Sequence, residues 1–282
     1  MGRTLRDVIE TLAGRLEAAG LVFAHGFDSA WDEAVALVLA VTGAPDHRSV
    51  LSQTVTEGDF ERIETLAGRR IDERMPLAYL LGRCRFAGHE FLIEPGVVIP
   101  RSPIGALIRR GFAPWLHAPP RRILDLCCGS GCIGLAAALK FPSATVDLAD
   151  VDAQAVDLAC RNSRLHGLEA RTRVFQSDLF DGLPEGSWDL IVSNPPYVDA
   201  PEMTRLPAEH RHEPARGLAG GTDGLDLVAR MLEALPERLT AGGSFVCEVG
   251  ASAPALLAGY PRLPFLWPDL PDGGEGIFIL QP

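Results

Sequence analysis

The sequence has 282 residues, 47% hydrophobic and 22% charged, a globular composition with room for one large and one smaller domain. A formal net charge of −11 argues against non-specific polyanion binding, because lysine and arginine supply most of the affinity for phosphates, and it favours a basic partner. The sequence has no apolar run long enough for a membrane span, no apolar core of a secretory signal near its start and no CxxC pair among six cysteines, so we expect a cytoplasmic protein with reduced thiols.

The first third of the chain predicts a small helical bundle. Three stretches carry apolar residues at helical spacing, and Thr4 can cap the first of them, as Asp28 or Ser29 can cap the second. The stretches cover residues 5–16, 29–41 and 60–71, and the bundle closes near Pro76. We assign residues 1–82 to this domain and expect it to recognise the substrate.

Residues 83–101 predict a β-hairpin that links two domains. Aromatic and β-branched residues surround Gly88 and a Pro95-Gly96 turn, a composition typical of two short strands. Ser102 then provides a helix cap, followed by Pro103 at the first helical position. The second domain is therefore expected over residues 102–282.

From residue 121 onward, short apolar runs alternate with helical patterns. Such alternation predicts β-α-β units, hence an α/β fold with a mainly parallel sheet covered by helices on both faces. The apolar runs are RRILDLC, ATVDLADV, ARTRVFQSD, WDLIVSN, GSFVCEVG and GIFIL, and the helical patterns are CIGLAAALKF, AQAVDLACRNSRLHG, LDLVARMLEALPERL and PALLAGY.

The turn after the first of these strands predicts a nucleotide-like ligand. It reads Asp125-Leu-Cys-Cys-Gly-Ser-Gly-Cys-Ile-Gly134, and small residues at this point let a ligand approach the backbone closely. Asp150 ends the second strand, where a carboxylate can accept hydrogen bonds from ribose hydroxyls. The fingerprint G-x-G-x-x-G is absent, which disfavours NAD and FAD, although a glycine turn of this kind also occurs for structural reasons alone.

The segment Asn194-Pro195-Pro196-Tyr197 follows a later strand and predicts an N–H2 clamp. Two prolines stiffen the turn, the Asn194 side-chain oxygen and the Pro195 carbonyl can each accept one hydrogen of a planar amide or amine, and Tyr197 offers a flat face. An amide nitrogen is a poor nucleophile, so fixed geometry aimed at an activated methyl group would replace a general base. A plain structural turn is the alternative.

These residues resemble the Rossmann-like methyltransferases that use S-adenosylmethionine, in particular the protein-glutamine N5-methyltransferases. Pieces of the resemblance, in chain order, are EFLIEPGVVIPRSPIGALI, ILDLCCGSGCIGLA, VDLADVDAQAVDLACRN, QSDLFDGLP, DLIVSNPPYVDAPEM, RHEPARGLAGGTDGLDLVARML and GGEGIFIL. The resemblance implies a mainly parallel seven-stranded sheet, preceded by a helical domain and a hairpin, with S-adenosylmethionine as the cofactor.

The resemblance also implies roles for individual residues. The clamp on the glutamine amide would be Asn194, Pro195, Pro196 and Tyr197. The cofactor site would comprise Cys127, Cys128, Gly129, Ser130 and Gly131 at the methionine part, Asp150 at the ribose, Asp178 and Leu179 at the adenine, together with Asp125, Val151 and Asn194.

Within the family, the segment Ile99-Pro100-Arg101-Ser102-Pro103-Ile104 differs from the IPRPDTE of the release-factor enzymes. It resembles the branch acting on the third protein of the large ribosomal subunit, which implies a basic ribosomal protein as partner and suits the negative charge. The alternatives are a release-factor glutamine, the N6 amine of adenine in nucleic acid, and a non-catalytic assembly factor. Neither a membrane nor a specific nucleic acid is expected as a partner, and the oligomeric state stays open.

Several other polar residues receive no catalytic role. We expect no metal at His210, His212 and Glu213, because their spacing is poor for one. Cys127, Cys128 and Cys132 are expected to be small buried thiols rather than zinc ligands. Arg101 is interpreted either as a contact to the cofactor domain or the substrate or as a solvated arginine. Glu248 lies where a strand reaches the edge of the expected active site, and a helix-capping or solvent residue is an equal alternative.

Overall fold

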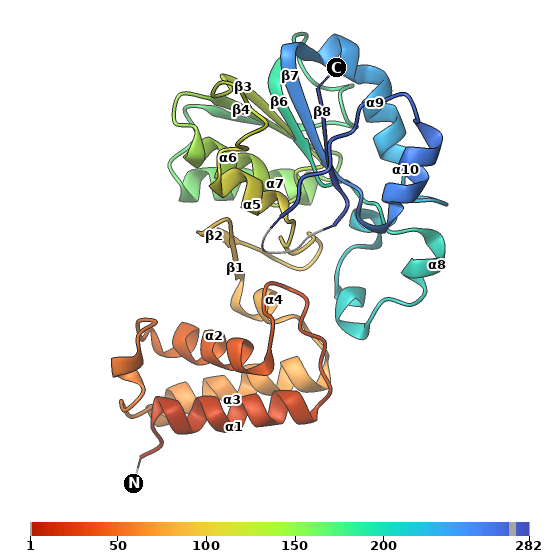
Figure 1. The fold of residues 1–282 in the computed structure, drawn as a ribbon. Coiled ribbons are helices and arrows are strands. Elements are labelled where there is room, and N and C mark those ends of the chain that lie inside the picture. Colours follow the sequence, from red (N-terminus) through yellow and green to blue (C-terminus); the bar gives the residue numbers. More distant parts are fainter. Residues whose placement is uncertain (1, 271–274, 282) are drawn as a thin grey trace. The chain divides into compact units, whose positions relative to one another are not determined.

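Figure 1 shows the computed structural model, which describes residues 2–270 and 275–281. The chain divides into two units, one from Met1–Cys84 with Pro207–His212, and one from Arg85–Leu206 with Glu213–Pro282. The first unit is therefore discontinuous in sequence, since Pro207–His212 returns to it. Gly273 and Gly274 of the motif GGEGIFIL lie outside the described residues.

Within the described residues, the first unit contains four α-helices and two short 3-10 helices. They are α1 (Leu5–Ala18), α2 (Ala30–Thr42), η1 (Arg48–Val50), α3 (Glu57–Asp72), α4 (Leu77–Leu81) and η2 (Ala208–His212). The side chains of Thr4 and Ser29 accept N–H groups of Asp7 and Asp32, so Ser29 rather than Asp28 caps the second helix. The helical bundle does not end at Pro76, because the further helix α4 begins directly after it. That helix is too short for helical periodicity to reveal.

Buried ion pairs connect the pieces of the first unit. Arg70 donates to both carboxylate oxygens of Glu33, at 2.8 and 3.1 Å, and burial raises the pKa of Glu33. Glu209, in the returning segment, accepts the N–H of Val22 at 3.0 Å and a guanidinium N–H of Arg74 at 3.3 Å. These hydrogen bonds satisfy buried charges and hold the returning segment on the unit.

The second unit contains the predicted α/β sheet. Its elements begin with the hairpin β1 (Arg83–Phe86) and β2 (His89–Leu92), of which β1 starts in the first unit. They continue with α5 (Ile104–Arg109), β3 (Arg122–Leu126), α6 (Cys132–Lys140), β4 (Thr145–Asp150), α7 (Ala153–Leu165), β5 (Thr172–Gln176), β6 (Trp188–Ser193), α8 (Ala200–Met203), η3 (Ala215–Gly217), α9 (Asp226–Arg238), β7 (Leu239–Glu248), η4 (Gly250–Ser252), α10 (Ala253–Gly259) and β8 (Ile277–Leu280).

The sheet has the order β5-β4-β3-β6-β7-β8, with β8 antiparallel and all other pairs parallel. The prediction of a seven-stranded sheet is wrong for the described residues, because this sheet has six strands there. Next to β8, a seventh segment pairs only through an isolated bridge, where Leu266 and Ile279 exchange N–H···O bonds of 2.9 and 2.8 Å. Pro264 and Pro268 flank that bridge, and prolines lack the N–H that a longer ladder needs.

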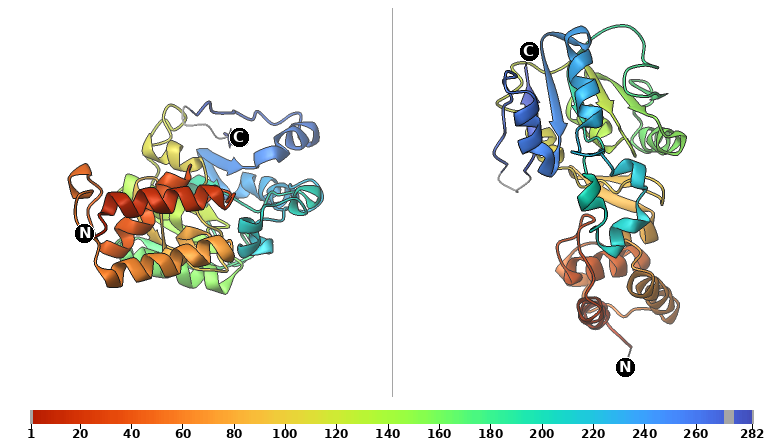
Figure 2. Two further views of the ribbon diagram at one scale, coloured as in Figure 1. Left: turned by 90° about the horizontal axis from the view of Figure 1, so that it is seen from below. Right: turned by 90° about the vertical axis from the view of Figure 1, so that its right-hand side faces the viewer.

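Helices cover both faces of the sheet, as predicted. In Figure 1, α5, α6 and α7 lie on one side and α9 and α10 on the other, and Figure 2 shows the same layers from two more directions. The core between the sheet and α9 includes Leu124, Ile191, Met231 and Phe245. None of the helices in residues 2–270 and 275–281 combines the length and apolar character needed to cross a bilayer.

The hairpin has its two strands on either side of Ala87 and Gly88, and the residues after β2 leave the strand conformation. Asn162 on α7 holds this region, because its amide accepts the N–H of Leu92 at 2.7 Å and donates to the carbonyls of Leu92 and Ser130 at 3.0 and 2.9 Å. The hairpin is thereby joined to the turn that follows β3.

Candidate active site

A cavity of about 220 Å³ lies in the second unit where the parallel strands end. Its walls include the first residues after β3, β5 and β6 and the last residues of β4 and β7, the edge at which open α/β sheets bind ligands. The sequence-predicted residues that line it are Cys127, Cys128, Gly129, Ser130, Asp150, Val151, Asp178, Leu179, Asn194, Pro195, Pro196 and Tyr197. Asp125 and Gly131 are not among the lining residues.

Asp125 and Gly131 instead support the turn between β3 and α6 without lining the cavity. The Asp125 carboxylate accepts the N–H of Gly134 at 2.7 Å, near the start of α6, and complete burial raises its pKa to about 8. Gly131 has a φ of +78°, and a Cβ there would approach side-chain atoms of Ala159 and Leu148 to 3.0 Å. Glycine therefore permits both the left-handed backbone and the close packing of α6. Cys127 also adopts a positive φ, +55°, which is uncommon for a residue with a side chain.

Asp150 is held by backbone N–H groups beside the cavity. One carboxylate oxygen accepts the N–H of Gly129 at 2.8 Å and the other accepts that of Asp152 at 2.9 Å. Burial raises the pKa of Asp150, and these two hydrogen bonds oppose the rise. The carboxylate therefore keeps a fixed orientation and has lone pairs left for a ligand hydroxyl. The neighbouring Val151 is 59% exposed.

The turn after β5 is fixed by a serine. The Ser177 hydroxyl donates to the carbonyl of Leu179 at 2.8 Å and accepts the N–H of Gly182 at 2.8 Å. Leu179 is buried and has a φ of +50°. Asp178 is exposed and forms an ion pair of 3.0 Å with Arg230 on α9. This turn presents an apolar side chain and a carboxylate on the same wall of the cavity.

The Asn194-Pro195-Pro196-Tyr197 segment carries an unsatisfied acceptor. Asn194 Oδ1 is buried, and no hydrogen-bond partner for it occurs among the described residues. Buried oxygens of this kind normally find a partner, so a ligand N–H is the natural complement of an acceptor in a cavity wall. Just before it, Ser193 donates to the carbonyl of Leu126 at 2.8 Å, which ties the end of β6 to β3.

A glycine-rich loop over residues 217–224 packs against this segment. Val198 donates its N–H to the carbonyl of Leu218 at 2.8 Å, and Gly220 donates to that of Val198 at 2.9 Å. A Cβ on Gly220 would lie 2.7 Å from the Cα of Tyr197, and one on Gly224 would lie 2.2 Å from its carbonyl oxygen. Glycine therefore lets the backbone of this loop pack directly against the segment from Asn194 to Tyr197 and support it.

Two residues whose roles the sequence left open belong to polar networks at the cavity. Arg101 donates to both oxygens of the buried carboxylate of Glu213, at 2.7 and 3.0 Å, so it is not a solvated arginine. Glu248 is 5% exposed and accepts the hydroxyls of Tyr197 at 2.7 Å and Ser102 at 2.5 Å, so it is not a solvent residue. Sequence reasoning missed these pairings, because partners this far apart along the chain leave no local signal.

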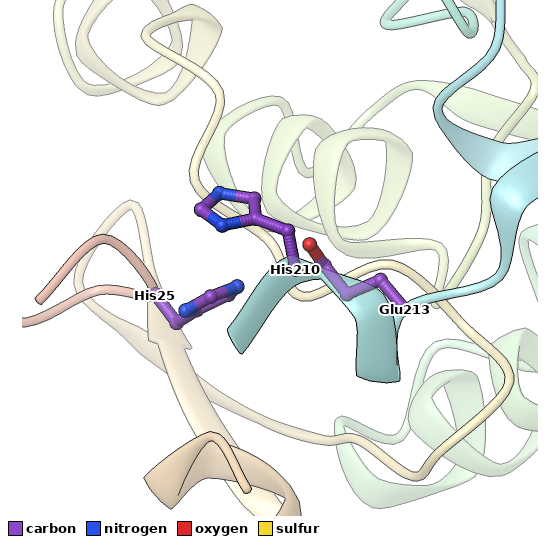
Figure 3. Close-up of side chains that lie close together, drawn as sticks. All are labelled: His25, His210 and Glu213. Carbon is purple, nitrogen blue, oxygen red and sulfur yellow. The ribbon is translucent and has the colours of Figure 1, made fainter. Parts of the chain in front are cut away.

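His210 and His212 contact other residues of the first unit. His212 Nε2 lies 2.8 Å from the carbonyl oxygen of Glu73. The rings of His210 and His25 lie close together (Figure 3), and their centroids are 4.6 Å apart. Burial raises the pKa of the Cys127 and Cys128 thiols.

Comparison with known proteins shows that this chain is similar to methyltransferases. The methyltransferase small domain family matches residues 112–211. A "Ribosomal protein uL3 glutamine methyltransferase" of Bordetella pertussis (strain Tohama I) is 44% identical over 282 residues, covering 99% of this chain and 95% of the relative. A second, of Francisella tularensis subsp. tularensis (strain SCHU S4), is 41% identical over 282 residues, covering 98% and 90%.

A solved structure supports the fold. The catalytic domain of hMettl16, in complex with MAT2A 3′UTR hairpin 6, matches with a TM-score of 0.53 at 16% identity and covers 86% of this chain and 91% of that chain. At this identity the likeness concerns the fold alone, and it confirms the predicted Rossmann-like methyltransferase architecture.

Proposed function

The chain belongs to the family of the ribosomal protein uL3 glutamine methyltransferases, and we propose that it transfers a methyl group from S-adenosylmethionine to the side-chain amide nitrogen of a glutamine in ribosomal protein uL3. The observation that carries the reaction type is the buried, unpartnered Asn194 Oδ1 in the cavity wall, followed by two prolines. The residues of 1–82 would recognise the protein substrate. A ribosomal substrate implies a cytoplasmic reaction.

The cavity residues fit S-adenosylmethionine. Asp150 offers a fixed carboxylate to ribose hydroxyls, the turn after β3 offers close backbone, and Leu179 offers an apolar surface to adenine. Ser130 also lines the cavity, and its buried Oγ has no hydrogen-bond partner among the described residues, as expected of a group that completes its hydrogen bonds with a ligand. When bound, the cofactor would supply an activated methyl group.

The residues of the clamp would then act on the substrate amide. Asn194 Oδ1 and the Pro195 carbonyl accept one N–H each, which fixes the plane of the amide and favours a pyramidal nitrogen with its lone pair directed at the methyl donor. The nitrogen would gain the methyl group as the S–CH3 bond of the donor breaks, with the electron pair left on sulfur, and one amide proton would pass to water. Orientation and hydrogen bonding thus do the work of a base, because an amide N–H is too weak an acid for a carboxylate to deprotonate.

Direct methylation assays test this proposal. The purified chain is incubated with methyl-labelled S-adenosylmethionine and, in parallel, with unmethylated uL3, a peptide release factor and an adenine-containing oligonucleotide. We expect label in uL3 alone, located on a glutamine side chain by mass spectrometry. Label confined to the release factor would contradict the assigned protein substrate, and label confined to the oligonucleotide would contradict amide methylation.

A further inference from the structure

Tyr197 is fixed at three different points. Its hydroxyl donates to Glu248 Oε1 at 2.7 Å, and its carbonyl accepts the Ser252 hydroxyl at 3.3 Å. Its ring lies so close to Gly250 that a Cβ there would be 2.5 Å from the ring atom Cε2. Tyr197 also lines the cavity, so the ring is held from the protein side while it borders the ligand space.

Glu248 accepts the Tyr197 hydroxyl, and the burial of its carboxylate carries a free-energy cost of desolvation. The carboxylate is buried at the end of β7, and no ion pair with a basic side chain is formed within residues 2–270 and 275–281. Its oxygens are satisfied by two hydroxyls, from Tyr197 on Oε1 and from Ser102 on Oε2. Arg101 lies close enough to favour the charged form, but its own guanidinium is bound to Glu213.

A hydrophobic residue at position 248 would avoid the desolvation of a buried carboxylate, which stabilises a fold poorly even when it is paired. Burial raises the pKa of Glu248, while the Ser102 and Tyr197 hydroxyls work against the rise. Stability alone therefore does not account for a carboxylate at this position. The two hydroxyl partners indicate that function, because one of them belongs to the clamp.

We propose that Glu248 is a positioning residue: its carboxylate, itself oriented by Ser102, fixes the hydroxyl of Tyr197 and thereby sets the plane of the ring against which the substrate amide packs. This inference rests on the proposed function for the identity of the substrate. The orientation of the ring does not depend on that identity, and it can be measured separately.

The first test measures the ring itself. The chain has three tyrosines, so NMR of protein labelled with carbon-13 in the tyrosine rings gives few signals, and Tyr197→Phe identifies those of Tyr197. We expect slow ring rotation in the native protein and rotation at least about tenfold faster in Glu248→Ala, with Glu248→Gln between them because its amide keeps one acceptor oxygen. Equal rotation rates in all three proteins would overturn the proposal.

The second test measures catalysis. Glu248→Ala should lower kcat for the protein substrate about 10- to 30-fold, as expected when a reacting group loses its alignment, and leave the Kd for S-adenosylmethionine within about threefold. Glu248→Gln and Ser102→Ala should each lose less, in the same direction. If Glu248→Ala folds poorly, these two milder variants carry the test, and unchanged kcat in both would refute it.

A double variant separates positioning from general stabilisation. If Glu248 acts through the Tyr197 hydroxyl, Tyr197→Phe combined with Glu248→Gln should lower kcat no further than the worse single variant, whereas independent roles would give multiplied losses. Glu202→Gln is the matched control, because this exposed carboxylate also acts electrostatically on Tyr197 but is not its hydrogen-bond acceptor. It should leave both ring rotation and kcat unchanged. Altered ring rotation without methylation of uL3 would reject only the proposed substrate.

Discussion

The two ends of the cavity are held by different kinds of interaction. At the cofactor end, backbone N–H groups close in sequence hold the carboxylates: Asp125 binds Gly134, nine residues away, and Asp150 binds Gly129, 21 residues away. At the clamp end, Tyr197 binds Glu248 across 51 residues, and Glu248 binds Ser102 across 146. The first end is therefore a property of strand-turn-helix units, and the second depends on the whole sheet being assembled. Substitutions at the two ends should accordingly separate cofactor binding from turnover.

The largest loss of turnover without loss of cofactor binding is expected from Asn194→Ala. It removes the unpartnered acceptor without touching the Asp150 turn, so turnover should fall about 100-fold or more, the usual cost of losing one oriented hydrogen-bonding group in an active site. The Kd for S-adenosylmethionine, measured by calorimetry, should change less than about threefold. Asn194→Asp, which keeps an acceptor oxygen, should restore part of the turnover. Wild-type turnover in Asn194→Ala would show that the clamp takes no part in the reaction.

The opposite separation is expected from Asp150→Asn. An amide cannot accept the Gly129 and Asp152 N–H groups on both sides, and it removes a charged acceptor for the ribose, so the Kd for S-adenosylmethionine should rise about 10- to 100-fold. At saturating cofactor, kcat should recover most of its native value. Asp157→Asn, on the exposed side of α7, is the control and should leave calorimetric binding unchanged. An unchanged Kd in Asp150→Asn would count against a ribose contact.

A smaller effect on the clamp end is expected from Gly220→Ala. The new Cβ meets backbone atoms of Pro196, Tyr197 and Gly224 at 2.7 to 2.8 Å, and backbone cannot move aside as a flexible side chain would. We expect kcat to fall about tenfold, with little change in the Kd for S-adenosylmethionine. Gly259→Ala, where a Cβ meets nothing within 4 Å, provides the matched control. Equal activity of the two variants would show that the brace does not shape the clamp.

The last effect is on stability rather than on activity, and it sharpens the description of the cofactor end. The folded pKa of Asp125 is about 8, above the ordinary 3.8, so the folded state binds a proton that the unfolded state has released between those values. The contribution of this group to stability is therefore lost as pH rises through that window, by at most about 1.4 kcal/mol per pH unit. Asp125→Asn carries no charge and still offers an oxygen to the Gly134 N–H.

Urea denaturation of both proteins from pH 5 to pH 8 measures this effect. The unfolding midpoint of Asp125→Asn should rise relative to the wild type as the pH increases, because only the wild type pays for ionising the buried carboxyl. Asp157→Asn should follow the wild-type curve. Parallel curves for Asp125→Asn and the wild type would mean that burial does not raise the pKa of Asp125.

The sequence by itself determined what depends on near neighbours. Helix caps at Thr4 and Ser29, the alternation that produces a mainly parallel sheet, the glycine turn with Asp150, and the Asn-Pro-Pro-Tyr corner all follow from residues within one turn or one β-α-β unit. Cap hydrogen bonds, apolar periodicity and proline stiffness act over short distances and therefore leave motifs that can be read. For this reason, most of the residues predicted for the site line one cavity.

Only the tertiary structure decided what depends on distant partners. It reduced the expected seven strands to six in the described residues, assigned Pro207–His212 to the first unit, and buried Arg101 on Glu213 and Glu248 on Tyr197 and Ser102. It also showed that Asp125 and Gly131 support the turn after β3 and do not line the cavity. A buried charge is stabilised by whichever group the assembled fold brings within hydrogen-bonding distance, and residues separated by more than a hundred positions share no pattern in the sequence that would reveal the pairing.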